Sequence, residues 1–164
     1  MRSDPRFLGS GGPDAGRFGF TLLEMVVVLA IASTLLAIAA LSFSDYNERS
    51  SARRAAQVFA RDLTLARSMA VRGRETVTID FDEGGLWYTV TTAGGRELAR
   101  RRFGTSGDIR LSAIDLDQTG DSIRFSARGF GTLSATLGTA VFTAGSIAYR
   151  VQFNGMGAST VGEL

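Results

Sequence analysis

The sequence contains no histidine and no cysteine. Histidine is the commonest general base near neutral pH and the commonest metal ligand, and cysteine supplies thiol nucleophiles and disulfides. Their absence leaves catalysis to carboxylates and hydroxyls, and no pair or motif of these groups stands out as a catalytic site. We therefore expect a protein that is not an enzyme and that uses no metal and no cofactor.

Lysine is also absent, so all 18 basic residues are arginines. Against 16 acidic residues they leave a formal net charge of only +2. Such a small excess does not indicate a nucleic-acid partner. Proline occurs only at Pro5 and Pro13, so no later element contains the helix and strand breaks that proline causes.

The N-terminal part of the chain divides into two segments. Residues 1–19 are rich in glycine and arginine and lack apolar periodicity, so we expect a leader outside the folded protein. From Met25 to Phe43 there are 19 consecutive uncharged residues, close to the roughly 20 that cross a bilayer as a helix. Residues 20–43 are therefore predicted to form a transmembrane helix.

Residues 44–72 have the pattern of an amphipathic helix. Their apolar positions recur every three or four residues, at Ala52, Ala56, Phe59, Leu63, Ala66 and Met69. The charged residues between them are expected on the polar side: Arg53, Arg61, Asp62 and Arg67. No glycine or proline interrupts residues 20–72, so the pattern predicts one continuous helix of about 50 residues, roughly 75 Å long.

Residues 73–164 are predicted to form a β-rich head. Gly73 is a natural helix stop, and the apolar period then changes from about 3.6 to two. The predicted strands cover residues 77–81, 86–91, 97–103, 122–125, 139–143 and 147–153. The first two flank a glycine-containing turn and predict a hairpin. The expected fold class is α+β, with the long N-terminal helix packed through its amphipathic part on a small antiparallel sheet.

At the start of the apolar run, Gly19 precedes Phe20, and Glu24 is the fifth residue counted from Phe20. This junction resembles the prepilin signature of type IV pilins and type II secretion pseudopilins. The resemblance implies that a prepilin peptidase cuts between Gly19 and Phe20 and methylates the new amino terminus of Phe20. It also implies that Glu24 sets the axial register during filament assembly.

Glu24 is an energetically costly residue for a membrane helix. A carboxylate inside a membrane helix costs roughly 2.5–3.5 kcal/mol on insertion scales, so Glu24 requires a cationic partner. Cleavage would provide one, because the freed ammonium of Phe20 lies at the same depth. The alternatives are an ordinary signal anchor or a secretory signal peptide cut near residues 37–39. A secretory signal would not place an acid at the head of its apolar core.

A second motif narrows the family. The stretch Leu63 to Arg72, followed by Thr76 to Ile79, resembles the helix-to-strand region of the GspH/FimT group. This resemblance implies a minor pseudopilin of a type II secretion system, a structural subunit that assembles through its N-terminal helix into the periplasmic pseudopilus to drive protein export. It places the chain in the bacterial inner membrane as a single-pass protein with a periplasmic head.

The partners implied are other pseudopilins or pilins, the prepilin peptidase, the inner-membrane assembly platform and, before assembly, the lipid bilayer. One alternative is a FimT-like minor pilin of a type IV pilus, with DNA uptake as one role. Another is a membrane-tethered periplasmic binding module that never polymerises. DNA is not an expected partner, because residues 154–158 lack the arginine that FimT-like DNA binders carry there. Many pilins also close a C-terminal loop with a disulfide, which this chain cannot form without cysteine, so both differences favour a pseudopilin.

Three further features have a plain structural explanation. Asp115 to Asp121 partly resembles a calcium-binding loop, but a polar turn between strands is preferred because the twelfth position is Ser126, not glutamate. The run Arg100 to Arg102 is expected on an edge strand, with the middle arginine on the opposite face from its neighbours. Trp87 is expected on the outward face of the first hairpin, either as a partner contact or packed beneath a loop.

Overall fold

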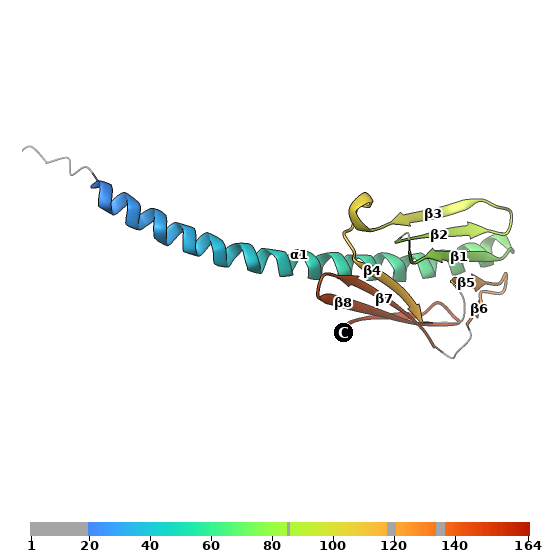
Figure 1. Ribbon diagram of the computed structural model, residues 1–164. Helices are drawn as coiled ribbons and strands as arrows, with labels where there is room; N and C mark the ends of the chain where they lie inside the picture. Colours follow the sequence, from blue (N-terminus) through green and yellow to red (C-terminus); the bar gives the residue numbers. More distant parts are fainter. Residues whose placement is uncertain (1–19, 85, 118–120, 134–136) are drawn as a thin grey trace, which may run out of the picture. The chain divides into compact units, whose positions relative to one another are not determined.

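The computed structural model describes residues 20–84, 86–117, 121–133 and 137–164, and of residues 40–42 and 106 only the backbone (Figure 1). Helix α1 spans Leu22–Gly73, so the prediction of one continuous helix is confirmed. The described residues fall into two compact units, one that ends at Ala39 and one that spans Ala40–Leu164. The second unit, called the head below, contains the C-terminal part of α1 and all strands.

Helix α1 ends in a left-handed cap. The backbone of Arg74 has φ 52°, and the amide of Glu75 donates to the carbonyl of Ala70 at 3.3 Å. This arrangement satisfies a carbonyl that the helix end would otherwise leave without a partner. The predicted stop at Gly73 is therefore right, although the left-handed residue is Arg74 and not the glycine.

The described part of the head contains nine strands in two antiparallel sheets. Their bounds are β1 Val77–Asp82, β2 Trp87–Thr92, β3 Glu97–Arg102, β4 Ala113–Asp117, β5 Ser122–Phe125, β6 Gly131–Thr132, β7 Leu137–Ala144, β8 Ile147–Asn154 and β9 Ser159–Glu163, with a short 3-10 helix at Gly104–Ser106. The strand orders are β3-β2-β1-β5-β6 and β4-β7-β8-β9. All six predicted strands are confirmed, whereas β4, β6 and β9 were not predicted.

The strands form two sheets and not the single sheet predicted, and both sheets pack on α1. Phe59 of α1 lies at the centre, with ring centroids 5.3 Å from Phe81 and 5.6 Å from Tyr88 of the first sheet. It also lies 5.5 Å from Phe142 and 5.8 Å from Phe153 of the second sheet. The predicted apolar helix face is buried as expected, with Met69 only partly covered. The head is thus a sheet pair closed around one aromatic side chain.

The prediction for Asp62 is wrong. This residue is only 3% exposed, because it lies on the packed side of α1 and not among the solvent-facing charges. Its carboxylate accepts hydrogen bonds from the Tyr88 hydroxyl at 2.8 Å and from the Arg101 guanidinium at 2.8 and 3.1 Å. Burial is tolerated because these donors replace water, which is the usual condition for a buried charge.

Candidate functional site

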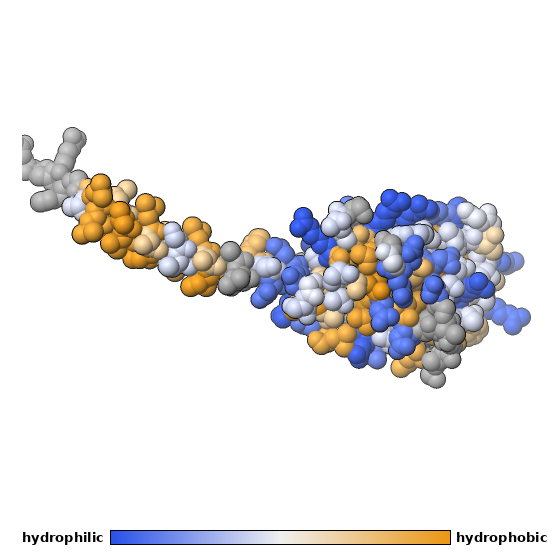
Figure 2. Space-filling model, in the orientation of Figure 1, coloured by the Kyte–Doolittle hydropathy of each residue, from blue (hydrophilic) through white to orange (hydrophobic). Residues whose placement is uncertain are grey.

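The N-terminal part of α1 is an uncovered apolar surface. Its 18-residue window of highest hydropathy averages 2.6 and is 0% buried, and α1 is the one helix among the described residues long and apolar enough to cross a membrane. Residues on every side of the helix are exposed, such as Leu22 at 82%, Leu23 at 72% and Val28 at 54%. In Figure 2 this region is mostly coloured hydrophobic, whereas the face of the head in view mixes hydrophilic and hydrophobic areas.

A helix that is apolar on all sides requires an apolar environment, either lipid or other helices. The hydroxyls in this segment fit such an environment. Ser33 donates to the carbonyl of Leu29 and Thr34 donates to the carbonyl of Ile31, both at 2.7 Å. Because these donors are satisfied within the helix, they add little cost to burial in lipid or in a helix bundle.

The first turn of α1 contains a cap that the sequence analysis missed. The Thr21 hydroxyl accepts a hydrogen bond from the amide of Glu24 at 3.1 Å. Thr21 is therefore the N-cap of the helix. Glu24 occupies the third position of the first turn, where the helix dipole stabilises a negative charge. The spacing Thr-x-x-Glu is a known start signal that could have been read from the sequence.

The predicted processing and assembly residues lie at this helix start. Gly19 falls outside the described residues, whereas Phe20 is described and is 76% exposed. Among residues 20–84, 86–117, 121–133 and 137–164, no cation forms an ion pair with the Glu24 carboxylate. The structure thus places an acid at the head of an apolar surface, four positions beyond Phe20, the residue expected to follow the cleavage site.

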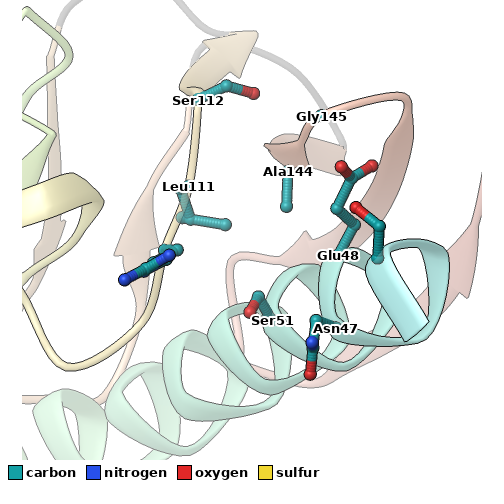
Figure 3. A pocket seen from close by; sticks show the side chains of 9 residues that line it. Asn47, Glu48, Ser51, Leu111, Ser112, Ala144 and Gly145 are labelled. Carbon is teal, nitrogen blue, oxygen red and sulfur yellow. The ribbon is translucent and has the colours of Figure 1, made fainter. Parts of the chain in front are cut away.

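Within the head, Glu48 holds the turn between β7 and β8. Its carboxylate accepts a hydrogen bond from the amide of Ser146 at 3.1 Å, and Figure 3 shows it pointing toward Gly145. Gly145 has φ 56°, and a Cβ there would collide with the Glu48 carboxylate. The turn therefore requires glycine for two independent reasons. The adjoining pocket of about 340 Å³ is lined also by Ser51 and Arg110.

The C-terminal strand is tied to α1 through Glu163. Its carboxylate accepts a hydrogen bond from the Tyr149 hydroxyl at 2.9 Å and pairs with Arg49 at 3.0 Å. Burial, and then the hydrogen bond to Glu163, raise the pKa of Tyr149 above its ordinary value. These contacts explain why β9 forms although its sequence shows little apolar alternation.

The arginine run lies on an edge strand as predicted. Strand β3 ends the first sheet, and Arg101 points inward to Asp62 while Arg100 and Arg102 are exposed. The hydrogen bond to Asp62, opposed by burial, raises the pKa of Arg101. Trp87 is only partly exposed, because the Arg100 guanidinium lies 5.9 Å from its ring centroid.

The calcium-like segment is partly strand. Asp115 and Asp117 belong to β4 and point outward, and Asp121 precedes β5, so the segment joins two strands as the preferred interpretation held. Residues 118–120 lie outside the described residues. In the part of the chain that the structure describes, no three acidic residues are grouped closely enough to hold a metal ion.

Comparisons with known proteins agree with this geometry. Residues 55–157 match the family model described as type II transport protein GspH, and residues 15–40 match the prokaryotic N-terminal methylation motif. Two curated proteins of Pseudomonas aeruginosa, each named fimbrial protein, are 29% identical over 112 residues, covering 65% of this chain and 73% of theirs.

Two solved structures are also similar. The type IV minor pilin FimU of Pseudomonas aeruginosa has a TM-score of 0.54 at 20% identity, covering 71% of this chain and 92% of FimU. The minor pseudopilin EpsH from the type 2 secretion system of Vibrio cholerae has a TM-score of 0.47 at 14% identity, over 70% of this chain and 96% of EpsH. The likeness to FimU confirms the fold class, a long helix packed on antiparallel sheets.

Proposed function

Because the chain belongs to the family of the type II transport protein GspH, we propose that it is a minor pseudopilin of a type II secretion system. In this proposal the chain is a structural subunit that enters a periplasmic filament, and the growth of that filament drives protein export. The family and the fold are those of structural pilin-type subunits, and we infer that the chain has no catalytic activity of its own.

The uncovered apolar part of α1 is the observation that carries the proposal. Before assembly the bilayer would cover this surface, with the head in the periplasm and a single pass through the inner membrane. In the filament the equivalent helices of neighbouring pseudopilins would cover it. An assembly platform in the membrane would transfer the helix from one apolar environment to the other, so the transfer requires no net exposure of apolar surface to water.

The start of α1 is proposed to control that transfer. Prepilin peptidase would cut between Gly19 and Phe20, and Phe20 would then be N-methylated, in keeping with the methylation motif matched over residues 15–40. The new ammonium would pair with the Glu24 carboxylate of a neighbouring subunit. In an apolar filament core an unpaired carboxylate is costly, so the pair would fix the axial position of each subunit.

A second candidate function is a minor pilin of a type IV pilus. The curated relatives named fimbrial protein favour it. Deletion of the gene separates the two functions, since a pseudopilin is required for export of secreted enzymes and a pilin for pilus-dependent motility. A gel-shift assay of the full chain with DNA would test the uptake role. The membrane-tethered binding module predicts that neither phenotype depends on Glu24.

The experiment replaces Glu24 by alanine in the full-length chain in its producing bacterium. We expect the fraction of the protein in sheared filaments to fall about tenfold or more, because one uncompensated charge in the filament core is worth more than 1.4 kcal/mol. The amount in the membrane should stay unchanged. Ser33→Ala is the matched control in the same helix and should assemble normally. Normal assembly of Glu24→Ala would contradict the proposal in favour of a simple anchor.

A further inference from the structure

From Arg49 onward, the exposed side of α1 carries arginines and no acids. From Arg49 to Arg72 the one acidic residue is Asp62, and it is buried on the packed side. At about 100° per residue, the exposed arginines fall within an arc of about 140°, roughly opposite Phe59. We call this set the arginine stripe: Arg53, Arg54, Arg61, Arg67 and Arg72.

The stripe is largely unpaired within the chain. Among the described residues, its members form no ion pair, and only Arg67 forms a side-chain hydrogen bond, to the carbonyl of Gly129 at 3.2 Å. Two exposed arginines outside this set do pair with acids, Arg49 with Glu163 at 3.0 Å and Arg100 with Glu97 at 2.6 Å. Like charges held along one helix face repel one another, so the stripe carries a cost that an anionic partner would remove.

The shape of the stripe leaves room for such a partner. A shallow groove of about 390 Å³ lies between Arg53, Arg54 and Gln57 near one end, and another of about 320 Å³ lies beside Thr64 and Arg67 near the other. Ser50 and Gln57 line the first groove beside its arginines, and Thr64, Ser68 and Val71 line the second. Carboxylates can therefore reach these groups and form the paired hydrogen bonds that arginine favours.

We propose that the arginine stripe is the docking surface for an acidic face on the head of a neighbouring filament subunit, a different chain from this one. The inference rests on the proposed function, since it needs a filament with neighbours. The stripe continues along the same helix whose apolar segment would contact other subunits in the filament core. A filament subunit that covers the apolar segment is therefore the partner best placed to contact the stripe.

Other anionic partners fit less well. Single-stranded nucleic acid is usually held by several aromatic rings interleaved with basic groups. Here one exposed ring, Tyr46, lines the groove at Arg53 and Arg54, and the one aromatic residue between Arg49 and Arg72 is the buried Phe59. Anionic headgroups would favour arginines beside the apolar segment, whereas the stripe reaches Arg72 in the last turn of α1. A protein surface matches an array of this length better than either alternative.

The test reverses three stripe charges in the full-length chain, as Arg53→Glu, Arg54→Glu and Arg61→Glu together, in the producing bacterium. We expect the fraction in sheared filaments to fall about tenfold, because three exposed pairs are lost and replaced by repulsion. The matched control reverses three exposed arginines outside α1, as Arg96→Glu, Arg102→Glu and Arg150→Glu. The control should assemble within about twofold of the unaltered chain, since ordinary surface changes cost little.

Limited proteolysis of the membrane fraction checks that both triple variants keep a folded head. Exchange of the same three stripe arginines for glutamine should give a smaller loss than exchange for glutamate, as expected for charge pairing. Normal filament entry of the stripe variant, or an equal loss in the control, would overturn the proposal. The proposal would also be overturned if the stripe variant entered filaments normally but lost binding to single-stranded DNA or to phosphatidylglycerol vesicles.

Two further results separate this inference from its premise. If Glu24→Ala blocks filament entry while the stripe variant enters normally, the stripe proposal falls and the proposed function stands. If the unaltered chain is absent from filaments, the proposed function itself falls.

A single cysteine introduced as Gln57→Cys tests whether a second copy of this chain occupies the stripe, because the chain has no other cysteine. Disulfide-linked homodimers in filaments would overturn the assignment to a different chain.

Discussion

Helix α1 serves two environments with two sequence patterns. Before Ala39 its apolar side chains are exposed on all sides, whereas between Ala52 and Ala70 most of them are gathered on one side and buried. The backbone hydrogen bonds of a helix are the same in both parts, so helix formation does not distinguish them. The distribution of apolar residues around the axis decides whether the chain supplies its own covering or leaves that to lipid and other subunits.

The largest expected change in stability comes from the part of α1 that the head itself covers. Phe59→Ala removes a ring that contacts both sheets and should lower the free energy of unfolding of the head by about 3–5 kcal/mol. Denaturant unfolding of the full-length chain in detergent, followed by tryptophan fluorescence of Trp87, would measure it. Val71→Ala on the exposed side of the same helix is the control and should change stability by less than about 0.5 kcal/mol. Similar losses in both variants would mean that Phe59 is not the centre of the core.

The next effect concerns the buried acid of the packed side. Asp62→Ala leaves the Tyr88 hydroxyl and the Arg101 guanidinium without their acceptor and should cost about 2–3 kcal/mol. We place this below the usual range for a broken buried pair because the side chain of Arg101 is 42% exposed and can be solvated. The same unfolding measurement applies, with Arg61→Ala as the neighbouring exposed control. A loss no larger than that of the control would show that the cluster adds nothing to stability.

These two residues show what the sequence could and could not predict. The position of Phe59 followed from its spacing alone, because apolar periodicity is a local signal. Asp62 follows Phe59 by three residues and so lies on the packed side, but its partners are 26 and 39 residues away along the chain. No local pattern identifies such partners, and a charge between apolar positions is usually solvated.

The strands also divide into those with a clear local sequence pattern and those that depend on tertiary contacts. β1 and β8 were predicted because their apolar alternation is long and clear. β4 also alternates, with Ile114 and Leu116 buried, but its aspartates led to the interpretation of this segment as a polar turn between strands. β9 has little alternation and is held by pairing with β8 and by Glu163, so only the tertiary structure defines it.

A smaller effect is expected at the turn held by Glu48. Gly145→Ala should cost about 1–2 kcal/mol, because alanine is strained at φ 56° and its Cβ would displace the Glu48 carboxylate. Glu48→Ala should remove the collision but not the backbone strain. The double variant should therefore lose less than the sum of the single variants in unfolding experiments. Strict additivity would show that the two residues do not interact.

The smallest effect is a pH dependence. Burial, together with the neighbouring Asp62 carboxylate, raises the pKa of Tyr88. A raised pKa gives stability that is complete below the ordinary tyrosine value of about 10 and is lost as pH rises above it, by up to about 1.4 kcal/mol per pH unit. Tyr88→Phe should cost about 1 kcal/mol at pH 7 and progressively less above pH 10. An advantage of the unaltered chain that stays constant from pH 8 to pH 11 would contradict this assignment.

The most direct measurement of the central claim is mass spectrometry of the mature chain purified from the membrane of its producing bacterium. The account predicts a protein that begins at Phe20 with one added methyl group on its amino terminus, ready to pair with Glu24 of a neighbour. A chain that keeps residues 1–19, or one that has lost the apolar part of α1 by cleavage near Ala39, would contradict it.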